Sequence, residues 1–153
     1  MATLYQIGEV CHRTGLTQRA LHYYDEIGLL IPSERLNGGQ RLYSAADLER
    51  IERIKSLKQL LGLSLSEIKS LLDADDARAH HLAAAEKAAD PSRRRKAVES
   101  ALRVTEEQLQ SVREKVHQLS QLQRQLERQV RDLRRLAAEP GPARVPENIG
   151  GRS

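Results

Sequence analysis

The fold of this chain is decided by residues 7–43, IGEVCHRTGLTQRALHYYDEIGLLIPSERLNGGQRLY. Two short helices are predicted here, at about residues 7–14 and 18–27, because apolar residues recur at helical spacing in both. Gly15 suits the left-handed position that follows a helix, and Thr17 can cap the second helix. Two short helices joined by such a turn are typical of a helix-turn-helix.

A small β-hairpin is predicted directly after the second helix. Pro32 prevents further helix, and residues 35–43 read as two short strands around Asn37-Gly38-Gly39. These tip residues tolerate the positive φ of a tight turn. A hairpin in this position is the wing of a winged helix-turn-helix, so the predicted class is mainly α with a small β-hairpin.

Two further short helices complete the predicted DNA-binding head, which we place at residues 1–76. Ser-Ala-Ala-Asp at residues 44–47 and Ser-Leu-Ser-Glu at residues 64–67 each resemble a capping box that begins a helix. Apolar residues follow the two boxes at helical spacing: Leu48, Ile51, Ile54, Leu57 and Leu61, then Leu65, Ile68, Leu71 and Leu72. Four short helices and one hairpin can bury a single small core.

A long helix with a heptad pattern is predicted for residues 92–138. Its a and d positions are apolar except for Thr105 and Gln123, and a seam of this length predicts that two copies pair as a coiled coil. The predicted dimerisation residues are Leu102, Leu109, Val112, Val116, Leu119, Leu126, Val130 and Leu133. Before this helix, residues 73–91 read as a hinge region, with the connector between domains at 77–91. The tail at 139–153, rich in Pro and Gly, is expected to be disordered.

The charge distribution limits how the head could bind nucleic acid. The chain has a net charge of +4, but residues 1–76 hold nine Lys and Arg against eleven Asp and Glu. The basic surplus therefore lies outside the predicted head, and DNA binding has to depend on a few placed residues. A single cysteine, Cys11, excludes a disulfide framework within the chain. No apolar run approaches membrane-spanning length and no signal-peptide pattern is present, so a cytoplasmic location and no membrane partner are expected.

Polar side chains on the second helix lie opposite its apolar stripe and near its N-terminus, the end that a recognition helix inserts into the major groove. Gln pairs well with an adenine edge, and Arg with guanine or phosphate. The predicted DNA-binding residues are Thr17, Gln18, Arg19, His22, Tyr23, Arg35 and Arg41. The alternatives are a solvated polar face for the helix and cross-strand charge for the two wing arginines. Tyr43 is expected to pack the wing onto the head.

Nothing in the sequence indicates an enzyme or a cofactor. A nucleophile–base pair, a Gly-rich phosphate loop and a carboxylate dyad are all lacking. His80 and His81 are adjacent and point to different sides of a helix, so no metal site is expected there. The basic run Arg93–Lys96 is either a solvated helix start or a secondary phosphate contact.

The order of these motifs resembles the MerR (mercury-resistance regulator) family. The resemblance covers about residues 4–72, and the long helix in kind. Its motifs are Ile7-Gly8-Glu9-Val10 with Gly15, LHYYDEIGLL at 21–30 followed by Pro32, GQRLY at 39–43 and GLSLSEI at 62–68.

The resemblance implies a bacterial transcription regulator that forms a homodimer through an antiparallel coiled coil. Members typically bind promoter DNA with an overlong spacer and, on a signal, bend and untwist it so that RNA polymerase can engage. This chain departs from the family at His22, where Arg is usual, and lacks the cysteines of metal-sensing members. The alternative is an architectural or scaffolding protein whose DNA binding has no specific operator.

Overall fold

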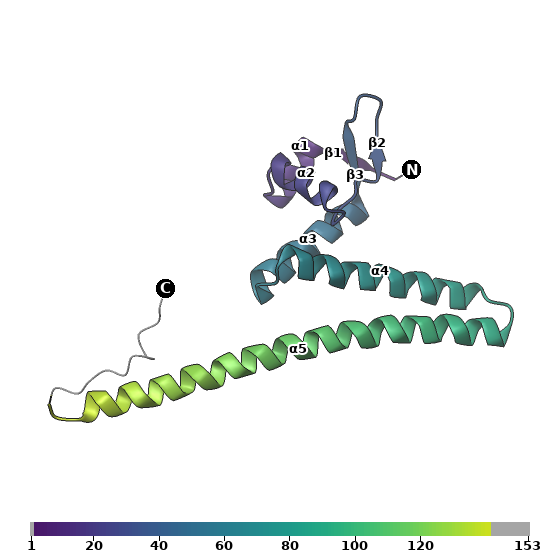
Figure 1. The fold of residues 1–153 in the computed structure, drawn as a ribbon. Coiled ribbons are helices and arrows are strands. Elements are labelled where there is room, and N and C mark those ends of the chain that lie inside the picture. The colour runs from purple at the N-terminus through teal and green to yellow at the C-terminus, as the bar shows by residue number, and fades with distance from the viewer. Residues whose placement is uncertain (1, 142–153) are drawn as a thin grey trace. The chain divides into compact units, whose positions relative to one another are not determined.

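The computed structural model of the chain describes residues 2–141, as helices and three short strands (Figure 1). The elements are β1 (Leu4–Gln6), α1 (Ile7–Thr14), α2 (Gln18–Glu26), β2 (Glu34–Arg35), β3 (Arg41–Ser44), α3 (Ala45–Leu61), α4 (Leu65–Lys87) and α5 (Pro91–Ala138). Contacts divide the chain into two units, Met1–Val104 and Thr105–Ser153. The predicted class, mainly helical with a small wing and a long C-terminal helix, is confirmed.

The turn between α1 and α2 has the predicted chemistry. Gly15 follows α1 in the left-handed region, with φ +75°. The Thr17 hydroxyl caps α2 by accepting from the Ala20 N–H at 3.1 Å. The hydroxyl of the buried Thr14 donates to the Val10 carbonyl at 2.7 Å, so this polar side chain is satisfied inside the head.

The wing is one part of a three-stranded antiparallel sheet in the order β1-β3-β2. β2 and β3 form the predicted hairpin, with Arg35 directly opposite Arg41 and with Gly38 and Gly39 at positive φ in its tip. β1 was not predicted, because three residues are too few to show an alternating pattern. Its pairing with β3 ties the wing to the start of the chain.

The core of the head lies between α1, α2, the wing, α3 and the start of α4. Tyr43 is fully buried in this core, as expected, and Cys11 packs against it from α1. Leu61, the last of the apolar residues predicted for the third helix, is part of α3 but lies outside the core. Leu61 is 64% exposed, since the last turn of α3 extends past the core. The buried residues are Val10, Leu21, Tyr24, Leu29, Leu30, Tyr43, Ile51, Ile54, Ile68 and Leu72.

Both predicted capping boxes are formed. Ser44 and Asp47 cap α3 reciprocally, and Ser64 and Glu67 do the same for α4. Gly62 ends α3 at φ +62°. Each box satisfies two N–H groups that a helix start leaves without a partner, which sets where these helices begin.

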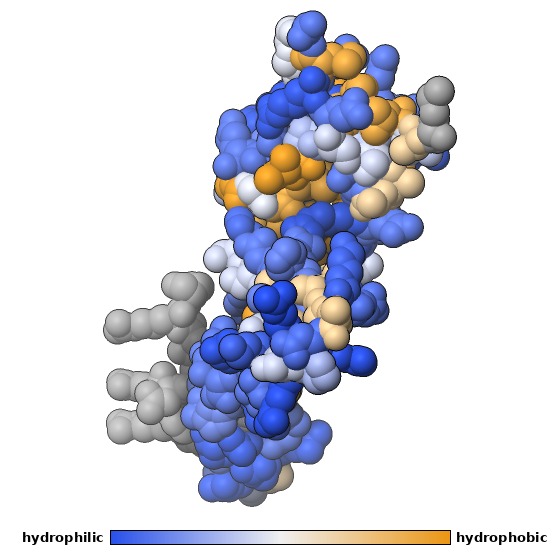
Figure 2. All heavy atoms as spheres, turned by 90° about the vertical axis from the view of Figure 1, so that its right-hand side faces the viewer, coloured by the Kyte–Doolittle hydropathy of each residue, from blue (hydrophilic) through white to orange (hydrophobic). Residues whose placement is uncertain are grey.

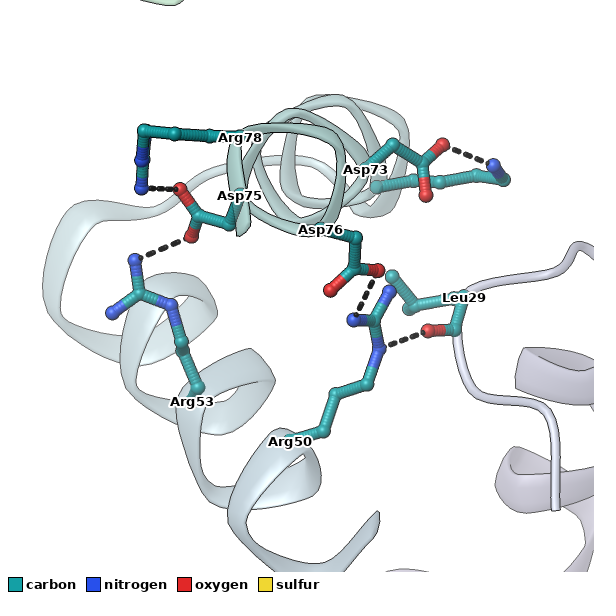
Figure 3. A network of polar contacts seen from close by, with 8 residues as sticks. Leu29, Arg50, Arg53, Asp73, Asp75, Asp76 and Arg78 are labelled. Atoms are coloured by element: carbon teal, nitrogen blue, oxygen red, sulfur yellow. Dashed lines mark hydrogen bonds and ion pairs between the residues drawn. The ribbon is translucent and has the colours of Figure 1, made fainter. Parts of the chain in front are cut away.

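The hinge predicted for residues 73–91 is wrong, because α4 continues as helix to Lys87 and the break is confined to residues 88–90. Alanine, the best helix former, is frequent in this stretch. The acidic start of the expected hinge is also neutralised by α3, as Figure 3 shows. Asp75 pairs with Arg53 at 3.0 Å, and Asp76 with Arg50 at 2.9 Å.

Arg50 joins three segments of the head. Its Nε donates to the Leu29 carbonyl at 2.9 Å, in the segment that follows α2, while its Nη1 pairs with Asp76 of α4 (Figure 3). Leu29 is fully buried, so this bond satisfies a carbonyl in an otherwise apolar region. The position of the helix-turn-helix relative to α3 and α4 is therefore held by polar contacts as well as by the core.

The helix α5 has 48 residues and begins as predicted at an Asp-Pro pair, where Asp90 accepts from the Ser92 N–H at 3.1 Å. Within α5 the one buried residue is Ala101. The prediction of a disordered tail at 139–153 falls, from residue 142 onward, outside the described residues. None of the helices described is long and apolar enough to span a membrane.

Candidate nucleic-acid interface

The first turn of α2 presents polar side chains to solvent. Thr17, Gln18 and Arg19 are exposed, whereas Leu21 and Tyr24 on the opposite side are buried in the core. The Thr17 hydroxyl accepts the capping bond, so its own proton is left to donate. The helix therefore offers donors from its N-terminal end, where backbone N–H groups and the helix dipole favour an anion.

Further along α2, Tyr23 is 49% exposed and His22 is half-buried. About half of the Tyr23 surface is thus accessible to solvent. His22 has less freedom than the residues of the first turn. The predicted α2 residues are therefore all at least partly accessible, with His22 the least open of them.

The two wing arginines do not stand free, because both bind the same carboxylate at the end of α2. Arg35 Nη2 donates to both oxygens of Asp25 at 2.7 Å, and Arg41 Nε donates to Asp25 Oδ2 at 2.7 Å. The Asp25 side chain is only 8% exposed, against 49% for Arg35 and 24% for Arg41. These three residues, which we call the Asp25 cluster, join α2 to both strands of the wing.

The cluster shifts the ionisation of its own carboxylate. Burial by itself raises the pKa of Asp25, but the hydrogen bond from Arg41 and the charge of Arg35 outweigh it, so this pKa lies below the ordinary value. Asp25 is therefore ionised at neutral pH. The sequence did not predict a role for Asp25. The helix dipole disfavours an acid near the C-terminal end of a helix, and the arginines that compensate for it come close only when the wing has folded.

The Asp25 cluster and the first turn of α2 lie at opposite ends of one short helix. At 1.5 Å per residue, Gln18 and Asp25 are separated by about 10 Å along the helix axis. The head thus carries polar groups at two points, one at the helix N-terminus and one at the wing. This spacing allows one end to contact bases while the other contacts the backbone.

The other polar clusters show no comparable arrangement. Among the described residues, no group of three or more His, Cys, Asp or Glu is placed to hold a metal ion. The His80 and His81 rings meet edge to face, with centroids 5.8 Å apart. The basic run at residues 93–96 is exposed at the start of α5. Figure 2 views the molecule from the side where α4 turns into α5, and that part of the surface is mainly hydrophilic.

The predicted dimerisation residues form an exposed apolar row along α5. Each of these eight leucines and valines is between 44% and 57% exposed. They are spaced at alternating intervals of three and four residues, apart from the polar Thr105 and Gln123, and so lie on one side of the helix. An apolar stripe of this length is unusual on a helix that remains unpaired in water.

Comparison with known proteins identifies the head. The family described as MerR HTH family regulatory protein matches residues 5–75. The HTH-type transcriptional activator TipA of Streptomyces coelicolor is 50% identical over 78 residues, which cover 50% of this chain and 30% of TipA. The HTH-type transcriptional regulator YfmP of Bacillus subtilis is 43% identical over 68 residues, which cover 44% of this chain and 49% of YfmP. The chain thus matches less than half the length of these relatives.

A solved structure shares the fold. It is that of HiNmlR, a MerR family regulator lacking the sensor domain, bound to promoter DNA. The superposition has a TM-score of 0.50 at 22% sequence identity and covers 89% of this chain and 94% of that chain. Residues 5–75, which form the head with its wing, thus belong to the MerR family of helix-turn-helix regulatory proteins.

Proposed function

We propose that this chain is a sequence-specific transcriptional regulator that binds double-stranded promoter DNA as a homodimer. The observation that carries the proposal is the exposed polar first turn of α2, set in a MerR-type head whose wing is bound to the same helix. Gln18 and Arg19 read base edges in the major groove. The backbone contacts are made by Thr17, His22, Tyr23, Arg35 and Arg41.

The homodimer forms through the apolar row of α5, as an antiparallel coiled coil. A 48-residue helix is about 70 Å long, far more than the head needs for its own packing. Pairing two copies covers the exposed leucines and valines and provides two heads for the two halves of a pseudo-palindromic site.

At the promoter, the dimer acts by bending and untwisting the spacer so that RNA polymerase can engage. This use of DNA deformability requires a head at each half of the site, and the pairing of two copies provides both heads. The name of TipA, a transcriptional activator, favours activation over repression. A regulator of this kind acts on promoter DNA in the cytoplasm.

The test begins by selecting a binding site with the full chain from a pool of random duplexes. We expect the selected duplex to bind at least about 10³-fold more tightly than random duplex at physiological salt. A ratio near one, with steep salt dependence, would instead indicate the architectural or scaffolding alternative.

Arg19→Ala then tests the recognition helix. We expect the substitution to reduce affinity for the selected site by about 10-fold and to relax the base preference when the selection is repeated. Arg53→Ala is the matched control, because Arg53 is exposed on α3 and pairs with Asp75. Equal effects of the two substitutions would show that net charge, rather than base contact, explains the loss.

A further inference from the structure

We propose that Asp25 is the positioning residue that makes the wing's DNA contact specific. By binding both wing arginines, Asp25 fixes the orientation of their guanidinium groups toward the DNA backbone. Without Asp25, these two side chains would be mobile. This inference rests on the proposed function and names how one part of the DNA-binding surface is controlled.

The geometry of the cluster leaves donors for a phosphate. Arg41 uses its Nε to bind Asp25, and its two terminal nitrogens make no hydrogen bond with any residue in the described range 2–141. Arg35 is engaged through a single terminal nitrogen, Nη2. A guanidinium has five N–H donors, so both groups can bind Asp25 and a phosphate together.

The strand register explains why a carboxylate is needed here. Arg35 lies directly opposite Arg41 in the β2–β3 pair, and like charges in that position destabilise a hairpin. One shared carboxylate reduces the charge of the cluster from +2 to +1. The substitution of Asp25 would therefore both add one positive charge and release the two side chains.

A mobile arginine and an oriented arginine have different effects on the sequence specificity of DNA binding. A mobile arginine binds the backbone of any duplex, which raises affinity for random DNA. An arginine held in place meets a phosphate at good distance only when α2 is seated correctly in the groove, so its contact favours the correct register. Asp25 thus lowers random binding and retains the contact in the specific complex.

The chain contains a closely matched control. Asp75 of α4 also binds two arginines, Arg53 at 3.0 Å and Arg78 at 2.6 Å (Figure 3), and its side chain is 22% exposed. Asp75→Asn therefore makes the same change in net charge and also removes the ion pairs of two arginines, but on α3 and α4 instead of the wing. An effect particular to Asp25 cannot be due to charge alone.

The experiment compares the full-length wild-type chain with its Asp25→Asn and Asp75→Asn variants on two probes: the duplex selected by the wild type and a random duplex of equal length. Affinity is measured between about 50 and 200 mM salt. For Asp25→Asn we expect the slope of log K against log salt on random duplex to steepen by about one, the value for one more neutralised phosphate. We also expect the ratio of selected to random affinity to fall about 10-fold, comparable to one mismatched base pair.

For Asp75→Asn we expect the slope and the ratio to stay within error of the wild type. Equal effects of the two variants would reduce the proposal to net charge and overturn it. An Asp25→Asn variant with unchanged slope and ratio would show that Asp25 only supports the fold, and would also overturn the proposal.

A wild type that binds duplex but selects no sequence would contradict the proposed function. In that case the salt slope on random duplex would still test the role of the Asp25 cluster. If the wild type bound no duplex at all, both would fail.

Arg41→Lys provides an answer if Asp25→Asn does not fold, as judged by circular dichroism. Lysine keeps the charge but lacks the forked donor geometry of arginine. We expect an unchanged salt slope and a reduced ratio of selected to random affinity. An unchanged ratio would mean that orientation at the wing has no part in specificity.

Discussion

The head and the long helix α5 differ in the burial of their large apolar side chains. In the head, ten residues from five elements and the segment after α2 are almost completely buried, and polar contacts such as those of Arg50 connect these parts. In α5, within residues 91–138, Ala101 is the one buried residue, and the eight leucines and valines of the apolar row are about half exposed. The head buries its large apolar side chains within one chain, whereas α5 leaves a row of them accessible, which the proposed homodimer would cover.

The size of this difference follows from the burial energy. Fully burying one Val or Leu side chain contributes about 1.5–3 kcal/mol. Eight half-exposed side chains therefore leave on the order of 10 kcal/mol per chain to be gained by pairing, before the cost of association.

If the chain is the proposed homodimer, the double substitution Leu119→Asp with Leu126→Asp should make it monomeric. It places charges in the middle of the apolar row, where pairing would bury them without partners. Sedimentation equilibrium measures the change. Gln118→Asp with Gln125→Asp is the matched control. It adds the same two charges to α5, but at exposed positions outside the apolar row. A double leucine variant that remains dimeric would refute the assignment of the interface.

Ile54→Ala should lower the free energy of unfolding of the head by about 2–5 kcal/mol, since Ile54 is fully buried and the substitution leaves a cavity. Leu60→Ala on the same helix should cost no more than about 0.5 kcal/mol, because Leu60 is 81% exposed. Chemical denaturation monitored by circular dichroism measures both. Similar losses in the two variants would mean that the core is placed wrongly.

Arg50→Met should destabilise the head by about 1–2 kcal/mol. Methionine keeps the apolar stem but leaves the buried Leu29 carbonyl without its donor. Arg53→Met is expected to cost less than about 1 kcal/mol, because the Arg53–Asp75 pair is largely exposed on the arginine side. The same denaturation measurement compares them, and equal losses would argue against a special role for the Leu29 contact.

Tyr43→Phe should leave stability unchanged or raise it by about 1 kcal/mol. The Tyr43 hydroxyl is buried and makes no hydrogen bond with any residue that the structure describes, and burial raises its pKa. Removing a buried hydroxyl without a partner removes its desolvation cost. A clear loss of stability on thermal melting would show that the hydroxyl has a partner in solution.

Most of the head could be predicted from local patterns. The helix boundaries at Thr17, Ser44 and Ser64 follow from capping chemistry, which acts within four residues and is therefore visible in the sequence. The prediction of a hinge at residues 73–91 failed because it depended on contacts between residues far apart in the sequence. The acidic run in α4 looks unfavourable until Arg50 and Arg53, more than 20 residues earlier, are placed beside it.

The candidate site shows the same division. The exposure of Gln18, Arg19 and Tyr23 follows from the apolar stripe on the other side of α2, and the sequence was sufficient to place them. The partner of the wing arginines was not predictable, because Asp25 is 10 and 16 residues away from them and on a different element.

The sequence by itself determined the elements, the apolar faces and the heptad row, since each depends on periodicity or on capping between near neighbours. The tertiary structure decided which charges meet: Asp25 with Arg35 and Arg41, and the acids of α4 with the arginines of α3. Ion pairs depend on the distance between groups in space, and that distance is set only when the chain has folded.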